Sequence, residues 1–509
     1  MLTGIIGRSA GSLEPARAAD GPTGVGGGRL AAEQRRELAL DALRGCRSVS
    51  ELANERGVSR KFVAQQRDRA RTAVQEAFES ETVPGDVLSW ISVTKTGLKR
   101  IVLSAALNGH GSVRGICEHV EAITGRRISE GGVWNILQEA VTRAEAINQA
   151  QDLRGIRAGA HDEIFSQGVP VLVGVEPESS FLYLLEASSS RDEVSWWAAL
   201  TDKHERQGLQ PRISISDAAR GLQAGVRSAF PDIELRGDVL HAQMQLSELM
   251  TYLENRAFGR LTLCEREERR MIRAKNRDQG QSRSKPLALA RVQSKDAVEL
   301  HDDMALLARW LTEMLSLIGP ALRERRELFD WILQEMRSRA PRSHRIAPVV
   351  TYFQNQRDAL LAFVPEIHTG LDRIAQAQGI PLDLVEAVYQ QMALDPEHPH
   401  YEAIQRRLYQ QAPQAADALD EALLQLLEGV LRASSAVENI NSILRGYFFL
   451  RRSTGPAFLK LLQFYLNHRR FRRSERPERV GRTPAEILTG QPHPHWLDML
   501  GYPSSPLLN

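Results

Sequence analysis

The sequence predicts a helix-dominated α/β protein, in which a mixed five-stranded sheet is interrupted by a long all-helical insertion and preceded by all-α units. Two observations favour this class. Three short strand-like runs begin near Arg157, and helix, strand, helix and strand follow them. From residue 242 to 431 the pattern is instead helical, apart from a basic, loop-like break at 274–286. Hairpin-linked strands followed by α/β crossovers make a mixed sheet covered by helices.

Length and composition indicate a soluble protein of several domains. The chain has 509 residues, and domains usually contain about 100–200. Its three cysteines lie far apart with no C-x-x-C pair, which argues against disulfides and structural zinc and fits a reducing cytoplasm. Neither a run of about 18 apolar residues nor a secretory signal is visible, so we expect a cytoplasmic protein without a membrane partner.

The N-terminal part of the chain predicts DNA binding. Residues 1–28 are rich in glycine and alanine and are expected to be disordered. Next, a helix, a tight turn at Gly57 and a helix capped by Ser59 match a helix-turn-helix, whose second helix enters the major groove. A plain helical hairpin is the alternative. The candidate DNA contacts are Ser59, Arg60, Lys61, Gln65 and Arg67.

A second unit of this kind is predicted over Gly97–Asn148. It reads as three helices, broken at 108–111 and 125–127, with the third capped by Ser129. Two tandem helix-turn-helix candidates favour DNA binding more than either does alone.

Three acids stand out by their position in the predicted elements. Asp162 lies within or at the end of the first strand, Asp217 ends the fourth strand "RISIS", and Glu438 lies early on a late helix. The first and fourth strands can lie side by side, so the two aspartates would face each other at one sheet edge. Three converging carboxylates repel unless cations lie between them, and two divalent ions about 3.5–4 Å apart activate phosphoryl transfer. An oxygen-only site of this kind suits magnesium.

Alternatives remain open for each acid. Glu163 competes with Asp162 as the first ligand, and Asp217 also suits a helix N-cap. For Glu438 the alternative is a solvated helix residue, with Glu428 as the nearest rival.

A basic segment lies between Arg445 and Arg482. It contains eleven Lys or Arg against Glu475 and Glu478, a local excess of nine positive charges in a chain whose net charge is +2. Such a segment can follow a phosphate backbone, although a solvated helix face is the alternative. The candidate DNA contacts are Arg451, Arg452, Arg469, Arg470, Arg472 and Arg473.

Several segments together resemble bacterial insertion-sequence transposases with a ribonuclease-H-like DDE catalytic domain. They are "DEIFSQGVPVLVGVEPES", "SISDAARGL", "DVLH", "SSAVENINSILR" and the closing "YLNHRRFRR" with "GRTPAEILTG", over roughly 155–490. The resemblance implies a ribonuclease-H-like sheet and makes Asp162, Asp217 and Glu438 the catalytic metal ligands. These would hold two Mg²⁺ ions, for which Mn²⁺ can substitute. Asp238 and His241 match a D-x-x-H variant near the active site, although an ordinary buried or capping histidine is the alternative for His241.

The implied activity is metal-dependent DNA strand cleavage and strand transfer at the ends of a mobile element, that is, DNA transposition and recombination. The expected partners are double-stranded DNA, as terminal inverted repeats and target, and further copies of the chain in a homodimer or larger assembly. A nucleoid-associated cytoplasmic location follows. A catalytically inactive DNA-binding regulator and a structure-selective nuclease on the same fold are the alternatives.

The expected organisation has seven parts. They are a disordered segment (1–28), a helix-turn-helix domain (29–80), a second one (81–152), the first part of the catalytic domain (153–241), the helical insertion (242–431), the second catalytic part (432–490) and a C-terminal tail (491–509).

Overall fold

The computed structural model describes residues 30–79, 93–275, 277–432, 435–450 and 455–504. It is dominated by helices and contains one mixed five-stranded sheet, as the sequence predicts. The chain divides into two compact units, Met1–Ser92 and Val93–Asn509. Among the described residues, no helix is both long and apolar enough to cross a membrane. The segment 1–28, predicted to be disordered, lies outside the described residues.

The first unit is a small bundle of α1 (Ala32–Arg44), α2 (Val49–Glu55) and α3 (Arg60–Glu79). Ser48 and Glu51 form a reciprocal capping box that fixes the start of α2. Gly57 has a φ of 61°, which glycine adopts without steric cost, and the chain turns there into α3. Leu52 and Val63 are fully buried in the bundle core. The predicted helix, turn and helix are confirmed as secondary structure.

The second unit begins with α4 (Lys95–Leu107), α5 (Val113–Thr124) and α6 (Glu130–Ala150). Ser129 caps α6 as predicted, because its side chain accepts the N–H of Gly132. These helices nevertheless differ from the separate domain expected at 81–152. Leu103 and Leu137 belong to the same hydrophobic core as Ile164 of the sheet. α6 packs against α18 (Pro456–His468), which lies on β3 (Phe181–Ala187), so the three helices are part of the larger unit.

The sheet consists of β1 (Ala158–Ser166), β2 (Val169–Glu176), β3 (Phe181–Ala187), β4 (Ile213–Ser216) and β5 (Glu234–Gly237). Its strand order is β3-β2-β1-β4-β5. The first three strands pair antiparallel, and the positive φ angles of Gln167 and Gly168 suit the tight β1–β2 turn. β4 pairs parallel with β1, and β5 pairs parallel with β4. The predicted adjacency of the first and fourth strands is therefore confirmed.

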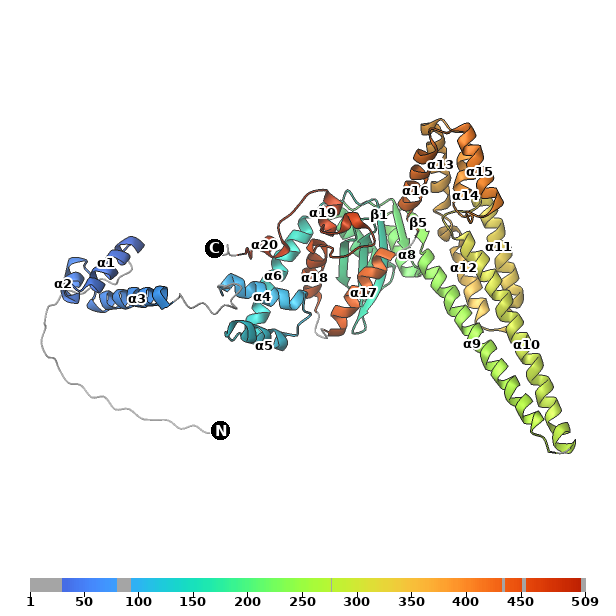
Figure 1. Ribbon diagram of the computed structural model, residues 1–509, viewed down its shortest axis with the longest axis horizontal. Helices are drawn as coiled ribbons and strands as arrows, with labels where there is room; N and C mark the ends of the chain where they lie inside the picture. Colours follow the sequence, from blue (N-terminus) through green and yellow to red (C-terminus); the bar gives the residue numbers. More distant parts are fainter. Residues whose placement is uncertain (1–29, 80–92, 276, 433–434, 451–454, 505–509) are drawn as a thin grey trace, which may run out of the picture. The chain divides into compact units, whose positions relative to one another are not determined.

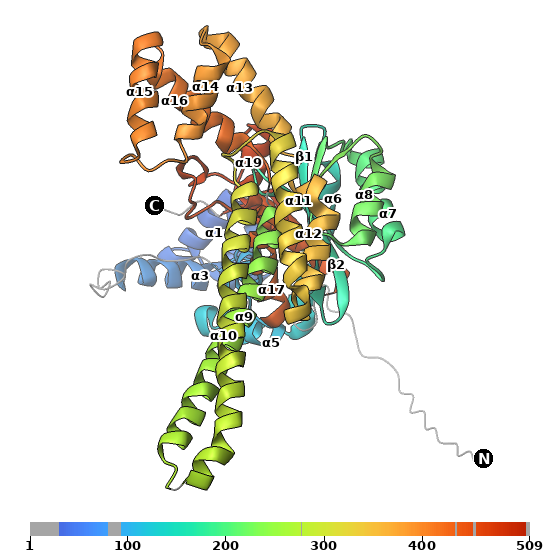
Figure 2. The same cartoon turned by 90° about the vertical axis from the view of Figure 1, so that its right-hand side faces the viewer.

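Helices cover both faces of the sheet. α7 (Glu193–Gln207) and α8 (Arg220–Ala229) pack together on one face, where Trp196 and Leu222 join the core of the inner strands (Figure 2). α17 (Ser435–Leu450) and α18 (Pro456–His468) cover the other face together with α6 (Figure 1). α18 is buried on nearly all sides and ends at His468. The arginines that follow, from Arg469 to Arg473, therefore lie outside the helix.

The C-terminal residues pack against the same core. They form a 3₁₀ turn η3 (Pro477–Arg479), α19 (Pro484–Thr489) and α20 (Trp496–Met499). Trp496 and Tyr502 are buried with α4 and α6, and Arg100 of α4 forms an ion pair of 2.7 Å with Asp498. The tail predicted from residue 491 is thus docked as far as the description extends.

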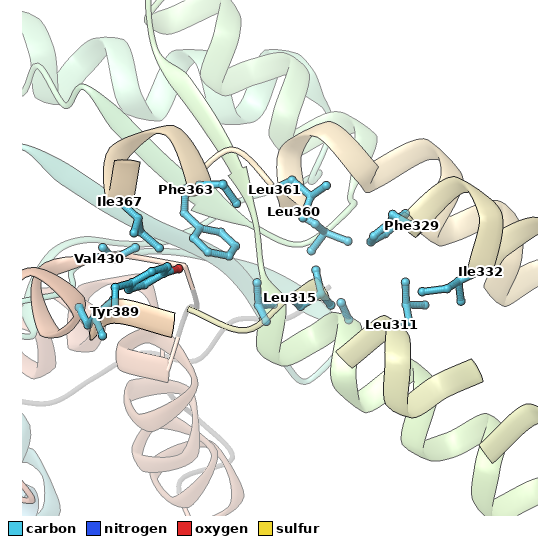
Figure 3. Packing of buried hydrophobic residues seen from close by; sticks show 14 of the residues in the cluster. Leu311, Leu315, Phe329, Ile332, Leu360, Leu361, Phe363, Ile367, Tyr389 and Val430 are labelled. Atoms are coloured by element: carbon cyan, nitrogen blue, oxygen red, sulfur yellow. The ribbon is translucent and has the colours of Figure 1, made fainter. Parts of the chain in front are cut away.

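The insertion is helical throughout its described residues, as predicted. It comprises α9 (Val239–Ile272), α10 (Arg277–Met314), α11 (Leu322–Arg339), η2 (Ala340–Arg342), α12 (Ile346–Leu360), α13 (Val364–Gln378), α14 (Leu382–Gln391), α15 (Pro399–Gln411) and α16 (Ala416–Gly429). Its helices share a hydrophobic core of their own, which includes Phe329, Phe363 and Tyr389 (Figure 3). The loop predicted at 274–286 is wrong in extent, because α10 already begins at Arg277 and contains Pro286. α9 and α10 therefore form one long hairpin (Figure 1).

The insertion is anchored to the last strand through Arg236 of β5. This side chain is only 4 % exposed, and its guanidinium forms ion pairs with Glu234 at 2.8 Å and with Glu366 of α13 at 2.7 Å. It also donates to the carbonyl of Leu431, where the chain leaves the insertion. One buried arginine therefore links the strand before the insertion to both a helix within it and its exit.

Candidate active site

The register of β1 and β4 brings two of the predicted acids together. His161 pairs with Ser216 in the parallel ladder, so the next residue in each strand, Asp162 and Asp217, occupies the next position. Asp217 is the first residue after β4, and its Oδ1 accepts the N–H of Ala219 at 3.0 Å. Helix α8 begins only at Arg220, so Asp217 forms an Asx turn ahead of the helix and is not its N-cap.

A third aspartate continues this row on β5. Ser216 pairs with Gly237, so Asp238 lies one position further on, beside Asp217. Asp238 is 4 % exposed, and its Oδ1 accepts the N–H groups of Leu240 and His241, which makes it the N-cap of α9. The predicted pair Asp238 and His241 therefore lies at this edge of the sheet, with Asp238 in a structural role as well.

Helix α17 brings Glu438 to the same sheet edge. Asn441, one turn after Glu438, is fully buried and donates from Nδ2 to Oδ2 of Asp162 at 2.5 Å. Glu438 is partly exposed and lies 3.9 Å from the guanidinium of Arg445. The sequence missed Asn441, although its i+3 spacing from Glu438 places both on one face of the helix.

The carboxyl group of Asp162 has a strongly perturbed pKa. Burial is the main cause that raises this pKa to about 7; the negative charges of Asp217, Glu438 and Glu163 contribute to the rise, and the N–H bond from Glu163 opposes it. The predicted acids are thus close enough to repel one another. Among the described residues, however, no group of three His, Cys, Asp or Glu side chains is arranged to hold a metal ion.

The donor chemistry of the site suits magnesium, because only carboxylate and amide oxygens are on offer. Each predicted ligand is instead turned toward a local partner: Asp162 toward Asn441, Asp217 toward Ala219, and Glu438 toward Arg445. Their assignment as metal ligands stays a prediction.

The rival acids lie in different surroundings. Glu163, the alternative first ligand, forms an ion pair of 2.8 Å with Arg191, and burial raises the pKa of its carboxyl group. Glu428, the rival of Glu438, is exposed on α16 within the insertion. Of the two, only Glu163 lies near the row of aspartates.

Tyr352 of α12 comes from the insertion and is not predicted by the sequence. Burial raises the pKa of its hydroxyl group, and the charges of Asp238 and Asp217 add to that rise. Its ring lies 6.1 Å from the ring of His241, between centroids. The insertion therefore supplies one wall of the acidic edge, a long-range contact that no local sequence pattern signals.

A hydrogen-bonded chain crosses the opposite face of the sheet, directly behind Asp162. His161 is 1 % exposed; its Nδ1 lies 2.8 Å from Oγ of Ser214, and its Nε2 lies 2.7 Å from the hydroxyl of Tyr183. Burial lowers the pKa of His161 to about 3, so the imidazole is neutral near pH 7. This chain ties β3, β1 and β4 together at the level of the acids.

The predicted DNA contacts are distributed unevenly. On α3, Arg60, Lys61 and Gln65 are exposed, as is the cap residue Ser59, whereas Arg67 is partly buried and bonds to Asp68. After α18 the four arginines 469, 470, 472 and 473 are exposed. Two of them have partners: Arg469 lies 5.8 Å from the ring centroid of Tyr465, and Arg470 donates to the carbonyl of Gly481. Arg451 and Arg452 lie outside the described residues.

Comparison with known proteins adds no relative, since no protein-family model and no curated protein matches the chain.

Proposed function

We propose that the protein is a DDE-type transposase, which cuts and joins DNA strands at the ends of a mobile element. One observation carries the proposal: the strand register sets Asp162 beside Asp217, while α17 brings Glu438 into electrostatic range of Asp162. Acidic residues gathered at the end of parallel strands cost stability, so a cation-dependent function is the natural reason for them. The mixed five-stranded sheet, with its first and fourth strands side by side, also supports the proposal.

The chain's own residues have distinct parts in this proposal. Asp162, Asp217 and Glu438 would hold two divalent ions, which supply activation of the attacking hydroxyl and stabilisation of the leaving 3′-oxygen. Asn441 fixes the Asp162 carboxylate through its amide. The proton that Asp162 retains near neutral pH must leave before the carboxylate binds a cation.

Recognition of the element ends is assigned to the first unit. The exposed Arg60, Lys61 and Gln65 lie on the first turns of α3, the part of a recognition helix that meets base edges. Because two ends must be joined in one reaction, the active form would be a dimer or larger assembly.

The test is nicking of a duplex that carries the inverted repeat bracketing the gene, with Mg²⁺ or Mn²⁺ present. Asp162→Asn, Asp217→Asn and Glu438→Gln should each reduce nicking by about 100-fold or more, since each removes several kcal/mol of charge stabilisation. The matched controls are Glu163→Gln, beside Asp162, and Glu428→Gln, the exposed glutamate of α16. Both should cut like the parent protein.

The outcomes separate the alternatives. If the three variants nick as well as the parent, the catalytic assignment is wrong. A parent protein that binds the repeat specifically but never nicks it would be the regulator. Cutting of branched DNA without joining of ends would indicate the nuclease.

A further inference from the structure

A basic pocket of about 760 Å³ lies at the beginning of α17, the helix that carries Glu438 and Asn441. It is lined by the turn between β2 and β3, by the beginning of α17 and by the loop that follows α18. Asn439 of α17 lines it, and two residues later Asn441 bonds to Asp162. The pocket and the contact to Asp162 thus both involve the first two turns of α17, on different sides of the helix.

Three arginines and one acid, Glu475, line this pocket. Arg479 has a structural role, because its guanidinium donates to the carbonyls of Pro177 and Glu178. Arg473 and Arg476 are exposed, and neither forms an ion pair with any residue that the structure describes. The pocket therefore presents two guanidinium groups that the protein itself does not neutralise.

The electrostatics of Arg479 supports an anion between these groups. Burial lowers the pKa of its guanidinium, and the positive charge of Arg476 lowers it further, while the carboxylates of Glu478, Glu176 and Glu178 partly oppose this shift. Two cations that repel each other beside a half-buried surface are stabilised by a shared anion. Planar guanidinium groups suit phosphate oxygens, with which they form paired hydrogen bonds.

We propose that this pocket binds a backbone phosphate of the DNA strand that reaches Asp162 and Glu438. The inference rests on the proposed function and adds Arg476 and Asn439 to the DNA-binding surface. The partly buried ring of Phe471 at the pocket gives an apolar surface for a sugar or base beside the phosphate.

The experiment measures equilibrium binding of a fluorescent duplex to the full chain in EDTA, over a series of NaCl concentrations. The test variant is Arg473→Ala with Arg476→Ala. The matched control is Arg206→Ala with Arg227→Ala, which removes the same charge from exposed arginines of α7 and α8 on the other face of the sheet. We expect the test variant to bind roughly tenfold more weakly. Its slope of log K against log salt should fall by about 0.9 for each phosphate that the protein no longer neutralises.

Sequence independence is part of the expectation. Two duplexes of unrelated sequence should lose affinity equally in the test variant, because backbone contacts carry no sequence information. The control variant should retain the parent slope. If the test variant keeps the affinity and slope of the parent, the pocket assignment is overturned.

A free phosphate is the other possible source of the anion. In thermal unfolding at constant ionic strength, inorganic phosphate should raise the melting temperature of the parent and of the test variant equally, and only slightly. If phosphate raises the melting temperature of the parent only, and the test variant binds DNA as the parent does, the pocket is a phosphate site and the DNA assignment is overturned. These measurements need no metal, whereas the nicking assay does. A failure of the pocket assignment can therefore be distinguished from a failure of the proposed transposase function.

Discussion

Two adjacent residues of β1, His161 and Asp162, lie on opposite faces of the sheet and have opposite electrostatic surroundings. On the face under α7, His161 is neutral, fully buried and hydrogen-bonded at both ring nitrogens. On the face under α17, Asp162 retains its proton to about pH 7 because burial and like charges oppose its ionisation. Successive side chains of a strand point to opposite faces, so one strand can serve both purposes. The hydrogen bonds of His161 stabilise the sheet on one face. On the other face, the burial and mutual repulsion of the carboxylates lower the stability of the fold.

The largest expected effect concerns the stabilising face. A Cβ at Gly159 would overlap the hydroxyl oxygen of Tyr183, and a Cβ at Gly174 would lie 2.5 Å from a ring carbon of the same residue. Gly159→Ala and Gly174→Ala should each lower the free energy of unfolding by about 3 kcal/mol. Urea unfolding at pH 7 measures both.

A second substitution, at Tyr183, makes this prediction specific. Tyr183→Phe removes the hydroxyl, so it should recover much of the stability lost in Gly159→Ala. It should recover none in Gly174→Ala, because the ring carbons remain. Equal rescue of the two glycine variants would show that the hydroxyl is not the clashing group.

The acidic face should respond in the opposite direction. The folded-state pKa of Asp162 lies above its unfolded value, so its cost in stability is absent below about pH 4, grows as pH rises, and is complete above about pH 7. Asp162→Asn should therefore stabilise the metal-free protein at pH 8 by about 2 kcal/mol, from a ceiling of roughly 4 kcal/mol reduced for solvent screening. Urea unfolding in EDTA measures the gain, which should vanish toward pH 4. A less stable variant at pH 8 would refute the account.

Magnesium should offset the same cost in the parent protein. At pH 8 and a free concentration tenfold above Kd, Mg²⁺ should add about 1.4 kcal/mol to the free energy of unfolding, and the gain should shrink as Asp162 becomes protonated below pH 7. Asp162→Asn and Asp217→Asn should lose the gain, whereas Glu428→Gln keeps it. Thermal unfolding with and without Mg²⁺ at pH 5.5 and pH 8 measures this. An equal gain in all variants would place the ion elsewhere.

The positions of Asp162 and Asp217 could be predicted from the sequence. The alternating run "ISIS" ends at Asp217, and a short strand after three hairpin strands suffices to place it beside Asp162. The alternation is a local property of the chain, while the pairing of the first and fourth strands follows from general rules on how strands connect, and the structure confirms both. The helices of the insertion are predictable for the same reason.

Long-range packing is not predictable in this way. Tyr352 reaches the acids only because α12 of the insertion packs against β5, and α6 joins the core of the larger unit through α18 although its pattern alone matches a helix-turn-helix. The stretch before Pro286 reads as a loop by composition, yet it is helical because α10 packs along α9. In each case tertiary contacts outweigh local preference.

The smallest expected effect comes from two serines of β4 that differ only in their partners. Ser214 bonds to His161, whereas the buried Oγ of Ser216 has no hydrogen-bond partner among the described residues. Ser214→Ala should cost about 1 kcal/mol, because it leaves Nδ1 of a buried imidazole unpaired. Ser216→Ala should be neutral or slightly stabilising, since it removes a polar group that gains nothing from burial. Urea unfolding of the pair at pH 7 measures the difference. If both variants lose the same stability, the hydrogen-bonded chain behind Asp162 contributes no more than packing, and the two faces differ less than their chemistry indicates.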